Sequence, residues 1–407
     1  MVQIAAKGFV PAALGREQLG QTAIVSPSIQ EISDQFFSHF RDLKDPRVER
    51  TRAHKLIDII AIAILAVMSG ASGWEGMEDY GKSKQQWLEQ FLELPNGIPS
   101  DDTFRRLFER LDPHEFQRGF QSWVSSLARL LGATVVAIDG KTHRGSYERN
   151  QQQSALQTVS AWASEHRLML AQVKVESKSN EINAIPALLK LLDLSGCIIT
   201  IDAMGTQKEI AQQIIVAKAD YVLTLKKNHP TLYEQVSSWF KAAQAQGLAG
   251  IEHSYDARVE AGHHRGETRR IWCVPVAQLG ELYQREQWAG LKTVVIVERT
   301  RRLWNDTSHE VQFYLSSLEA DAVKIGRVIR QHWGIENQLH WTLDVTFGED
   351  SSRVRRGHGP ENLGLLRRLA LNVLNQEQSF KGSVASKRRR AGWNNDYLLK
   401  ILQAGLL

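Results

Sequence analysis

The sequence predicts an α/β protein, with a core of mixed strands and helices that follows an all-helical region and receives a β-rich insertion. Three features predict this fold. Apolar residues recur at helical spacing over residues 29–131, short β-branched runs alternate with helical segments from Thr134 onward, and strand-like runs with polar turns fill residues 254–317. The chain has 407 residues, which is more than one hydrophobic core usually accommodates, so we expect more than one domain.

The region before the core is predicted to be helical. Residues 1–28 mix Gly, Pro, Ala and Gln without a clear period, and we expect them to be loosely ordered. Residues 29–131 are expected to form a domain of their own that binds DNA, and Ser100 or Asp101 is placed to cap one of its helices. That helix has a basic face, which fits either DNA phosphates or a solvated surface and consists of Arg105, Arg106 and Arg110.

The predicted core spans residues 132–380 and contains the insertion at 254–317. In the core, strands are expected at 134–141, 155–163, 168–175, 197–202 and 221–225, and helices at 180–194 and 207–217. In the insertion, strands are expected at 271–274, 293–297 and 311–315. Helical spacing returns at Asp321. Residues 381–407 are predicted to form a basic tail, with Lys387 to Arg390 followed by a final helix.

Two carboxylates follow β-branched runs in the predicted core. Asp139 follows Val135 to Ile138 and precedes Gly140, and Asp202 follows Ile198 to Ile201. Each Asp is expected where a buried strand leaves the sheet, and open α/β sheets bind ligands at such strand ends. Two acidic side chains there predict a metal site. The simpler alternative is that each Asp caps the helix that follows it.

A third carboxylate, Glu336, lies in the helix that begins near Asp321. It shares three- and four-residue spacing with Ile329, His332 and Trp333, so we expect Glu336 to face the core rather than water. The alternative is a buried Glu paired with Arg or His. Three carboxylates could hold two divalent ions that clamp an in-line phosphoryl transfer, and oxygen ligands favour Mg²⁺ or Mn²⁺ over zinc.

Composition restricts the class of protein. The net charge of +5 and the pI of about 9.1 permit a polyanionic partner. The two cysteines, Cys197 and Cys273, argue against a disulfide scaffold and a zinc cluster, which fits a reducing cytoplasm. The longest apolar run, Ile59 to Met68, is too short to span a bilayer, so no membrane partner is expected.

Together, these segments resemble insertion-sequence transposases of the DDE class, in the branch that includes the H-repeat-associated proteins. The likeness runs from about Phe37 to the C-terminus. The segments that carry it are Asp45–Arg47, Gly97–Phe108, Ile138–Lys141, Ile201–Gln207, Leu225–His229, His332–Asn337 and Asn362–Asn372.

The resemblance implies a ribonuclease-H-like core in which Asp139, Asp202 and Glu336 are the catalytic, metal-binding triad. It implies two Mg²⁺ or Mn²⁺ ions, cleavage of double-stranded DNA at element ends, strand transfer into target DNA, and a homodimer on DNA. A bacterial cytoplasmic location, with nucleoid association when active, follows. Related transposases outside this branch place Tyr, Arg and Lys around the glutamate, where this chain has Ile329, His332 and Leu343. Arg327 or Arg330 could replace that arginine.

Several other side chains are candidates for contacts with DNA, and each also fits an ordinary surface role. These are Lys141, His143, Arg144, Lys226, Lys227 and His229 after core strands, Arg265 with Arg269 and Arg270 in the insertion, and Arg330, His332 and Trp333 beside Glu336. Trp333 fits either packing in the core or stacking on a displaced base. A further acidic group could substitute as a metal ligand, and consists of Asp344, Glu349 and Asp350.

Two other functions stay open from the sequence. One is a ribonuclease-H-like nuclease that only hydrolyses its substrate. The other is a DNA-binding descendant of a transposase that has no catalytic activity, although the intact triad argues against it.

Overall fold

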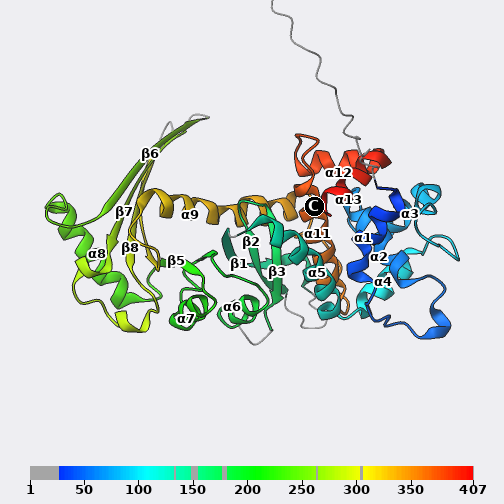
Figure 1. Cartoon of the computed structure of the whole chain (residues 1–407), viewed down its shortest axis with the longest axis horizontal. Coiled ribbons are helices and arrows are strands. Elements are labelled where there is room, and N and C mark those ends of the chain that lie inside the picture. Colours follow the sequence, from blue (N-terminus) through cyan, green and yellow to red (C-terminus); the bar gives the residue numbers. More distant parts are fainter. Residues whose placement is uncertain are drawn as a thin grey trace, which may run out of the picture.

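A nine-stranded mixed sheet runs from the middle of the protein to one end, in the order β3-β2-β1-β4-β5-β9-β8-β7-β6, and a helical bundle forms the other end (Figure 1). The computed structural model describes residues 27–132, 134–147, 155–176, 181–262, 265–302 and 306–406. The predicted loose N-terminus, residues 1–28, therefore lies almost entirely outside the described residues. Short 3₁₀ turns lie at Ser38–Phe40, Glu49–Thr51, Arg144–Ser146, Val276–Leu279 and Arg285–Gln287.

Five strands form the part of the sheet that the sequence predicted as the core. The first three form an antiparallel meander: β1 (Val135–His143), β2 (Leu156–Ala163) and β3 (Leu168–Lys174). The next two continue the sheet in parallel with β1: β4 (Ile198–Ile201) and β5 (Asp220–Leu225). The helices between them lie together below the sheet in Figure 1: α6 (Glu181–Lys190) and α7 (Lys208–Val216). All seven elements coincide with predicted segments.

The insertion extends this sheet rather than forming a separate one. Its antiparallel strands are β6 (Ser254–Gly262), β7 (Arg265–Pro275), β8 (Thr293–Arg302) and β9 (Thr307–Ser316). β9 pairs antiparallel with β5, which joins the two halves. The sequence did not predict β6, because this edge strand is polar and largely exposed, nor α8 (Pro230–Ala245), which precedes the insertion.

One long helix crosses the face of the sheet opposite α6 and α7. Its segments are α9 (Ala322–Gly334), a π-helical turn (Ile335–His340) and α10 (Trp341–Val345). Ile325 and Ile329 of α9 pack with Val295 on one face of the sheet. Ile185 of α6 and Ile210 of α7 belong to the core on the other face. The helix that carries the predicted glutamate therefore lies across the strands that carry the predicted aspartates.

The N-terminal helices share one hydrophobic core with the C-terminal helices. The N-terminal set is α1 (Ile29–Phe37), α2 (Leu56–Met68), α3 (Trp74–Leu88), α4 (Asp101–Arg110) and α5 (Pro113–Leu131). The C-terminal set is α11 (Gly359–Gln376), α12 (Val384–Trp393) and α13 (Asn395–Ala404). α2 is buried among them, with Ile59 to Met68 no more than 1% exposed. The helical region expected to be separate is thus built jointly with residues 359–404.

Two local predictions in these helices have clear outcomes. Ser100 caps α4, since its side chain accepts a hydrogen bond from the Thr103 amide. Half of the basic run in α12 is buried, so these residues are part of the helical core rather than of a solvated surface. The buried Arg388 donates to the carbonyl oxygens of Val67, Ala71 and Thr346, where a cation complements the helix ends. None of the described helices is long and apolar enough to cross a membrane.

Candidate active site

The register of two parallel strands places Asp139 beside Asp202. β1 and β4 pair in parallel as far as Ile138 and Ile201, and each aspartate is the next residue of its chain. Asp139 does not end its strand, as the sequence suggested, because β1 continues to His143 and pairs with β2 there. The aspartates are nevertheless side by side where the parallel pairing stops, as expected for a ligand site.

Asp202 also organises the turn that follows its strand. Its Oδ1 accepts hydrogen bonds from the amides of Met204, at 3.1 Å, and Gly205, at 3.3 Å. The turn leads toward α7, but the N-cap of α7 is Gln207, so Asp202 does not cap that helix as the simpler alternative supposed. A carboxylate has several acceptor positions, so these bonds at one oxygen leave capacity for a further ligand.

Glu336 lies at the start of the π-helical turn and is exposed, which corrects the prediction that it faces the core. The prediction extended the spacing of α9 through Gly334, but the π-helical turn changes the spacing there. Ile335 and Leu339 are the buried residues of the turn. Glu336 lines a cleft of about 140 Å³ together with Asp202, Lys226, His332 and Trp333.

The carboxylates act on one another through their charges. Burial, together with the negative charges of Asp202, Glu336 and Glu181, raises the pKa of Asp139 to about 7. Like charges gathered in a partly buried place disfavour ionisation. Asp139, Asp202 and Glu336 are therefore close enough to interact, and they form a local excess of negative charge.

Glu181 is a fourth carboxylate that sequence reasoning missed. It begins α6, and its carboxylate lies against Gly140, where the Cδ atom is 2.1 Å from the position of an added Cβ. Gly140 thus leaves room for this carboxylate beside β1, and an added side chain there would move the flexible end of Glu181. Burial, followed by the charge of Asp202, raises the pKa of Glu181. An acidic residue in the first turn of a helix is common, so the sequence carried no signal for this position.

The donor set fits a hard divalent cation in its chemistry. Carboxylate oxygens are the preferred ligands of Mg²⁺, and a cation would compensate the charges that raise the pKa of Asp139. In the described part of the chain, no three ligating side chains are already gathered around one point. An ion would therefore need the side chains of Asp139, Asp202 and Glu336 to turn toward each other.

Two histidines beside the carboxylates are neutral. Burial lowers the pKa of His332 to about 4, and its Nδ1 is 2.8 Å from the Thr200 hydroxyl. Burial also lowers the pKa of His340 to about 3, and its Nδ1 is 3.5 Å from Asp139 Oδ2. Neither imidazole supplies a compensating positive charge at neutral pH.

Comparison with known proteins identifies the family. A family model described as "Transposase DDE domain" matches residues 131–373, and one described as "DDE_Tnp_1-associated" matches residues 37–124. "Putative transposase YncI" of Escherichia coli O157:H7 is 38% identical over 379 residues, which cover 92% of this chain and 95% of that protein. "H repeat-associated putative transposase YhhI" of Escherichia coli K12 is 36% identical over 370 residues, covering 89% and 96%.

This chain belongs to the DDE transposase family. The family domain, residues 131–373, contains all three predicted catalytic carboxylates and ends within α11. A solved piggyBac transposase synaptic complex with hairpin DNA overlaps 89% of this chain and 78% of its own at 11% identity, with a TM-score of 0.39.

The structure sorts the predicted DNA contacts of the transposase by exposure. Arg144, Lys226, Lys227 and Arg330 are exposed, and Arg330 pairs with Glu260 at 3.2 Å. His229 is half-buried, and its Nε2 is 2.6 Å from the Thr206 carbonyl oxygen.

The insertion and the N-terminal region are less clearly basic than the sequence suggested. Arg265 begins β7, but its side chain lies outside the described atoms. In β7, Arg269 pairs with Glu267 and Arg270 with Glu298. The basic face of α4 is partly neutralised within its own helix, by pairs that join Asp102 to Arg105 and Arg106, and Glu109 to Arg105.

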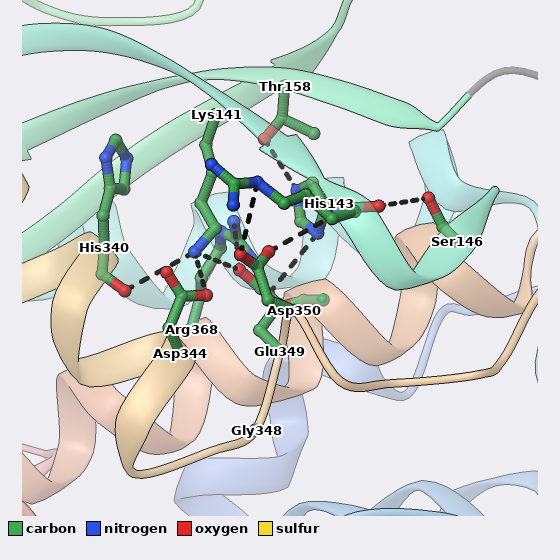
Figure 2. Close-up of polar contacts among 12 residues, drawn as sticks. Lys141, His143, Ser146, Thr158, His340, Asp344, Gly348, Glu349, Asp350 and Arg368 are labelled. Atoms are coloured by element: carbon green, nitrogen blue, oxygen red, sulfur yellow. Dashed lines mark hydrogen bonds and ion pairs between the residues drawn. The ribbon is translucent and has the colours of Figure 1, made fainter.

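Lys141 and His143 do not face DNA, which corrects that prediction. Their side chains are 7% and 6% exposed and join a buried polar network with Asp344, Glu349 and Arg368 (Figure 2). The network also corrects the idea that Glu349 could be a spare metal ligand. Glu349 is 1% exposed, and Arg368 already holds its Oε1 at 2.6 Å.

Trp333 lies between the two environments that the sequence allowed. It is half-buried at the wall of the cleft beside Glu336. Arg299 and Arg301 of β8 lie over its ring, at 5.0 and 5.8 Å from the ring centroid. Cations over a Trp face are attracted by the ring electrons. Trp333 is thus part of a wall of aromatic and basic groups, not of the hydrophobic core.

Proposed function

We propose that this transposase cuts DNA at the ends of an insertion sequence and joins those ends to target DNA. The reaction would be a metal-dependent phosphoryl transfer at Asp139, Asp202 and Glu336. The observation that supports this most strongly is that burial, with the charges of Asp202 and Glu336, raises the pKa of Asp139 to about 7. Such a cluster of carboxylates is costly without a cation, whereas a carboxylate in a structural ion pair already has one.

The sheet topology supports a ribonuclease-H-like core. Strands β1 to β3 form an antiparallel meander, and β4 and β5 follow β1 in parallel, which gives the order 3-2-1-4-5. This topology sets Asp139 and Asp202 on adjacent central strands. The π-helical turn that follows α9 carries Glu336, which lines the same cleft as Asp202.

Asp139, Asp202 and Glu336 would hold two Mg²⁺ or Mn²⁺ ions. When bound, such ions supply activation of the attacking oxygen and neutralise charge on the leaving oxygen. The protein itself orients the carboxylates through the turn at Asp202 and the pairing of β1 with β4. Lys226 extends a positive charge from the end of β5 into the cleft, where a DNA phosphate would approach.

The partners we propose are double-stranded DNA at the element ends and in the target. Lys226 lines the cleft with Asp202 and Glu336, and it would contact phosphates together with the exposed Lys227, Arg144 and Arg330. The helical region 29–131 would bind DNA at the element ends. We propose a homodimer on DNA and a bacterial cytoplasmic protein that associates with the nucleoid when active.

The test is a cleavage and strand-transfer assay with the DNA that flanks this reading frame. Wild-type protein with Mg²⁺ is expected to cut the element ends and join them to a target plasmid, whereas Glu336→Gln is expected to do neither. Equal activity of the two proteins would refute the assignment of Glu336. Cleavage without any joined product would instead favour the hydrolytic nuclease, and binding of the ends without cleavage would favour the non-catalytic descendant.

A further inference from the structure

A buried charged network lies directly beside the proposed active site. Glu349 is at its centre, and its carboxylate contacts Arg368 at 2.6 Å and Lys141 at 3.5 Å (Figure 2). The side chains of Glu349 and Arg368 are both 0% exposed. Buried charges are tolerated only when they are paired with good geometry, so this network defines fixed positions for its members.

One side of the network belongs to β1. Asp139, Lys141 and His143 alternate along the strand, so their side chains project from the same face of the sheet. Lys141 Nζ forms an ion pair with Asp344 and lies 3.5 Å from the carbonyl oxygen of His340. His143 Nε2 is 3.0 Å from the Thr158 hydroxyl. The lysine nearest to Asp139 is therefore bound to the helix opposite.

The other side belongs to the helix that carries Glu336. His340 and Asp344 follow Glu336 at steps of four residues, through the π-helical turn and into α10. His340 faces Asp139, and Asp344 faces Lys141. Two successive contacts thus connect β1 with this helix, and they set how far Glu336 stands from Asp139.

Two glycines show that the packing around this network is close. A Cβ on Gly364 of α11 would lie 3.2 Å from Arg368 Nη1 and 3.7 Å from Glu349 Oε1. A Cβ on Gly145 would lie 2.3 Å from the Ser352 carbonyl oxygen. The segment that contains Glu349 is therefore pressed against both α11 and the end of β1.

We propose that Lys141, which Glu349 holds in place, and its partner Asp344 are positioning residues that set the separation of Asp139 and Glu336 for divalent ions. This inference rests on the proposed function, because it concerns the same carboxylates. Lys141 and Asp344 touch neither ion nor DNA in this scheme. They fix the position of β1 relative to the helix opposite. This position determines the distance between Asp139 on β1 and Glu336 on the helix.

The test measures metal binding as well as activity. Lys141→Met, Asp344→Asn and the double variant are compared with wild type, with Mn²⁺ titrated by calorimetry in the absence of DNA and Mg²⁺ titrated in the cleavage assay. Loss of groups that orient metal ligands typically weakens metal affinity or activity about 10–100-fold. Each single variant is expected to show such a loss for Mn²⁺. Because the two residues act as a pair, the double variant should lose no more than the worse single variant.

A matched control separates positioning from general stability. Lys387 is another buried lysine, with Nζ 2.9 Å from the Leu374 carbonyl oxygen and 3.6 Å from Glu377, and it lies in α12 away from the carboxylates. Lys387→Met is expected to lower Tm without changing the Mn²⁺ affinity. Lys141→Arg, which keeps the charge, is expected to recover part of the Mn²⁺ affinity that Lys141→Met loses.

The outcomes are distinguishable. A wild-type protein that neither binds Mn²⁺ nor cleaves DNA would refute the proposed function itself. An active wild type together with a folded Lys141→Met or Asp344→Asn variant of unchanged Mn²⁺ affinity would overturn the positioning role alone. If Lys141→Met does not fold, the Mn²⁺ affinity of Asp344→Asn tests the proposal instead. The Asp344 side chain is 33% exposed, and replacing its carboxylate by an amide of the same size is a mild change.

Discussion

Two groups of carboxylates lie next to each other along β1, and they are built in opposite ways. Asp139, with Asp202 and Glu336 nearby, has a raised pKa because burial and like charges act together. Glu349 is buried more deeply, yet the cations around it, led by Arg368, outweigh the effect of burial and hold its pKa well below the usual range. The negative charge of a carboxylate is thus compensated at Glu349 and left uncompensated at Asp139, two positions along β1 from the Lys141 that contacts Glu349.

This difference separates structure from function. A carboxylate with a structural role is paired with a cationic side chain of the protein. The carboxylates of a metal site have no such partner until the metal ion binds. The pH dependence of stability should differ in sign between the two groups. Glu349 contributes stability that is present above its unfolded pKa of about 4.5 and is lost as the pH falls. Asp139 contributes stability that is present below about 3.8 and is lost as the pH rises to about 7.

The largest expected effect comes from breaking the compensated group. Arg368→Met leaves Glu349 buried without its main partner, and removal of one member of a buried pair typically costs about 3–5 kcal/mol. Urea unfolding at neutral pH measures the loss. The double variant Glu349→Leu/Arg368→Met should recover part of it, because no unpaired carboxylate is then left. A loss below about 1 kcal/mol in Arg368→Met would contradict the structural role of this pair.

The uncompensated group should respond in the opposite direction. Asp139→Asn removes a charged ligand and is expected to abolish cleavage, while it stabilises the protein without metal at pH 8. One pKa unit corresponds to about 1.4 kcal/mol, so a shift from 3.8 to about 7 sets an upper limit of roughly 4 kcal/mol. Chemical unfolding from pH 4 to pH 8 should show wild type losing stability relative to the variant. If the unfolding free energies of the two proteins changed in parallel with pH, the pKa of Asp139 would not be raised in the folded protein.

Trp333 sharpens the comparison at the edge of the cleft. Because its ring faces Arg299 and Arg301 rather than the core, Trp333→Ala should cost less stability than the roughly 3–5 kcal/mol of a core tryptophan. If the ring stacks on a displaced base, Trp333→Ala should lose about 1–3 kcal/mol of stacking free energy, and strand transfer should slow accordingly. Thermal melting and strand-transfer rates of the same protein separate the two effects. Strand transfer by Trp333→Ala at the wild-type rate would contradict the stacking role.

The smallest expected effect concerns single phosphate contacts. Lys226→Ala should lower the slope of log K against log salt by about 0.9, the contribution of one released counterion. Arg106→Ala is the matched control, because Arg106 is already paired with Asp102 at 3.0 Å within α4. The salt dependence of DNA binding is measured for both variants from about 50 to 200 mM salt, and the two slopes are compared. An unchanged slope for Lys226→Ala would place that lysine outside the DNA path.

The sequence predicted the strands that lead to the two aspartates, because a β-branched run is a local signal. It did not predict that β1 continues past Asp139, although the parallel register of β1 and β4 does bring Asp139 beside Asp202. The catalytic roles of the two aspartates stay predictions. Glu336 was singled out by helical spacing and by the resemblance, and its catalytic role stays a prediction. Its exposure was not predicted, since a π-helical turn cannot be read from residue spacing. Glu181 and Glu349 were missed or misassigned, because their partners are distant in the chain and only the folded structure joins them.

The same distinction explains what was predicted of the fold. Apolar, regularly spaced elements such as α2 and β1 were found from the sequence. The polar edge strand β6 was not, because its residues lie mostly in solvent and carry little hydrophobic pattern. The burial of Arg388 in a run of basic residues was equally hidden, since the carbonyl oxygens that it binds belong to α2 and to the segments that follow α2 and α10.

Anomalous diffraction from crystals soaked in Mn²⁺ tests the contrast between the two groups most directly. The uncompensated carboxylates should bind the ions, so two anomalous peaks about 3.5–4 Å apart are expected among Asp139, Asp202 and Glu336. No peak is expected at Glu349, because Arg368 and Lys141 already occupy its oxygens. Peaks at Glu349, or a metal-free cleft beside Asp202 at saturating Mn²⁺, would contradict the account.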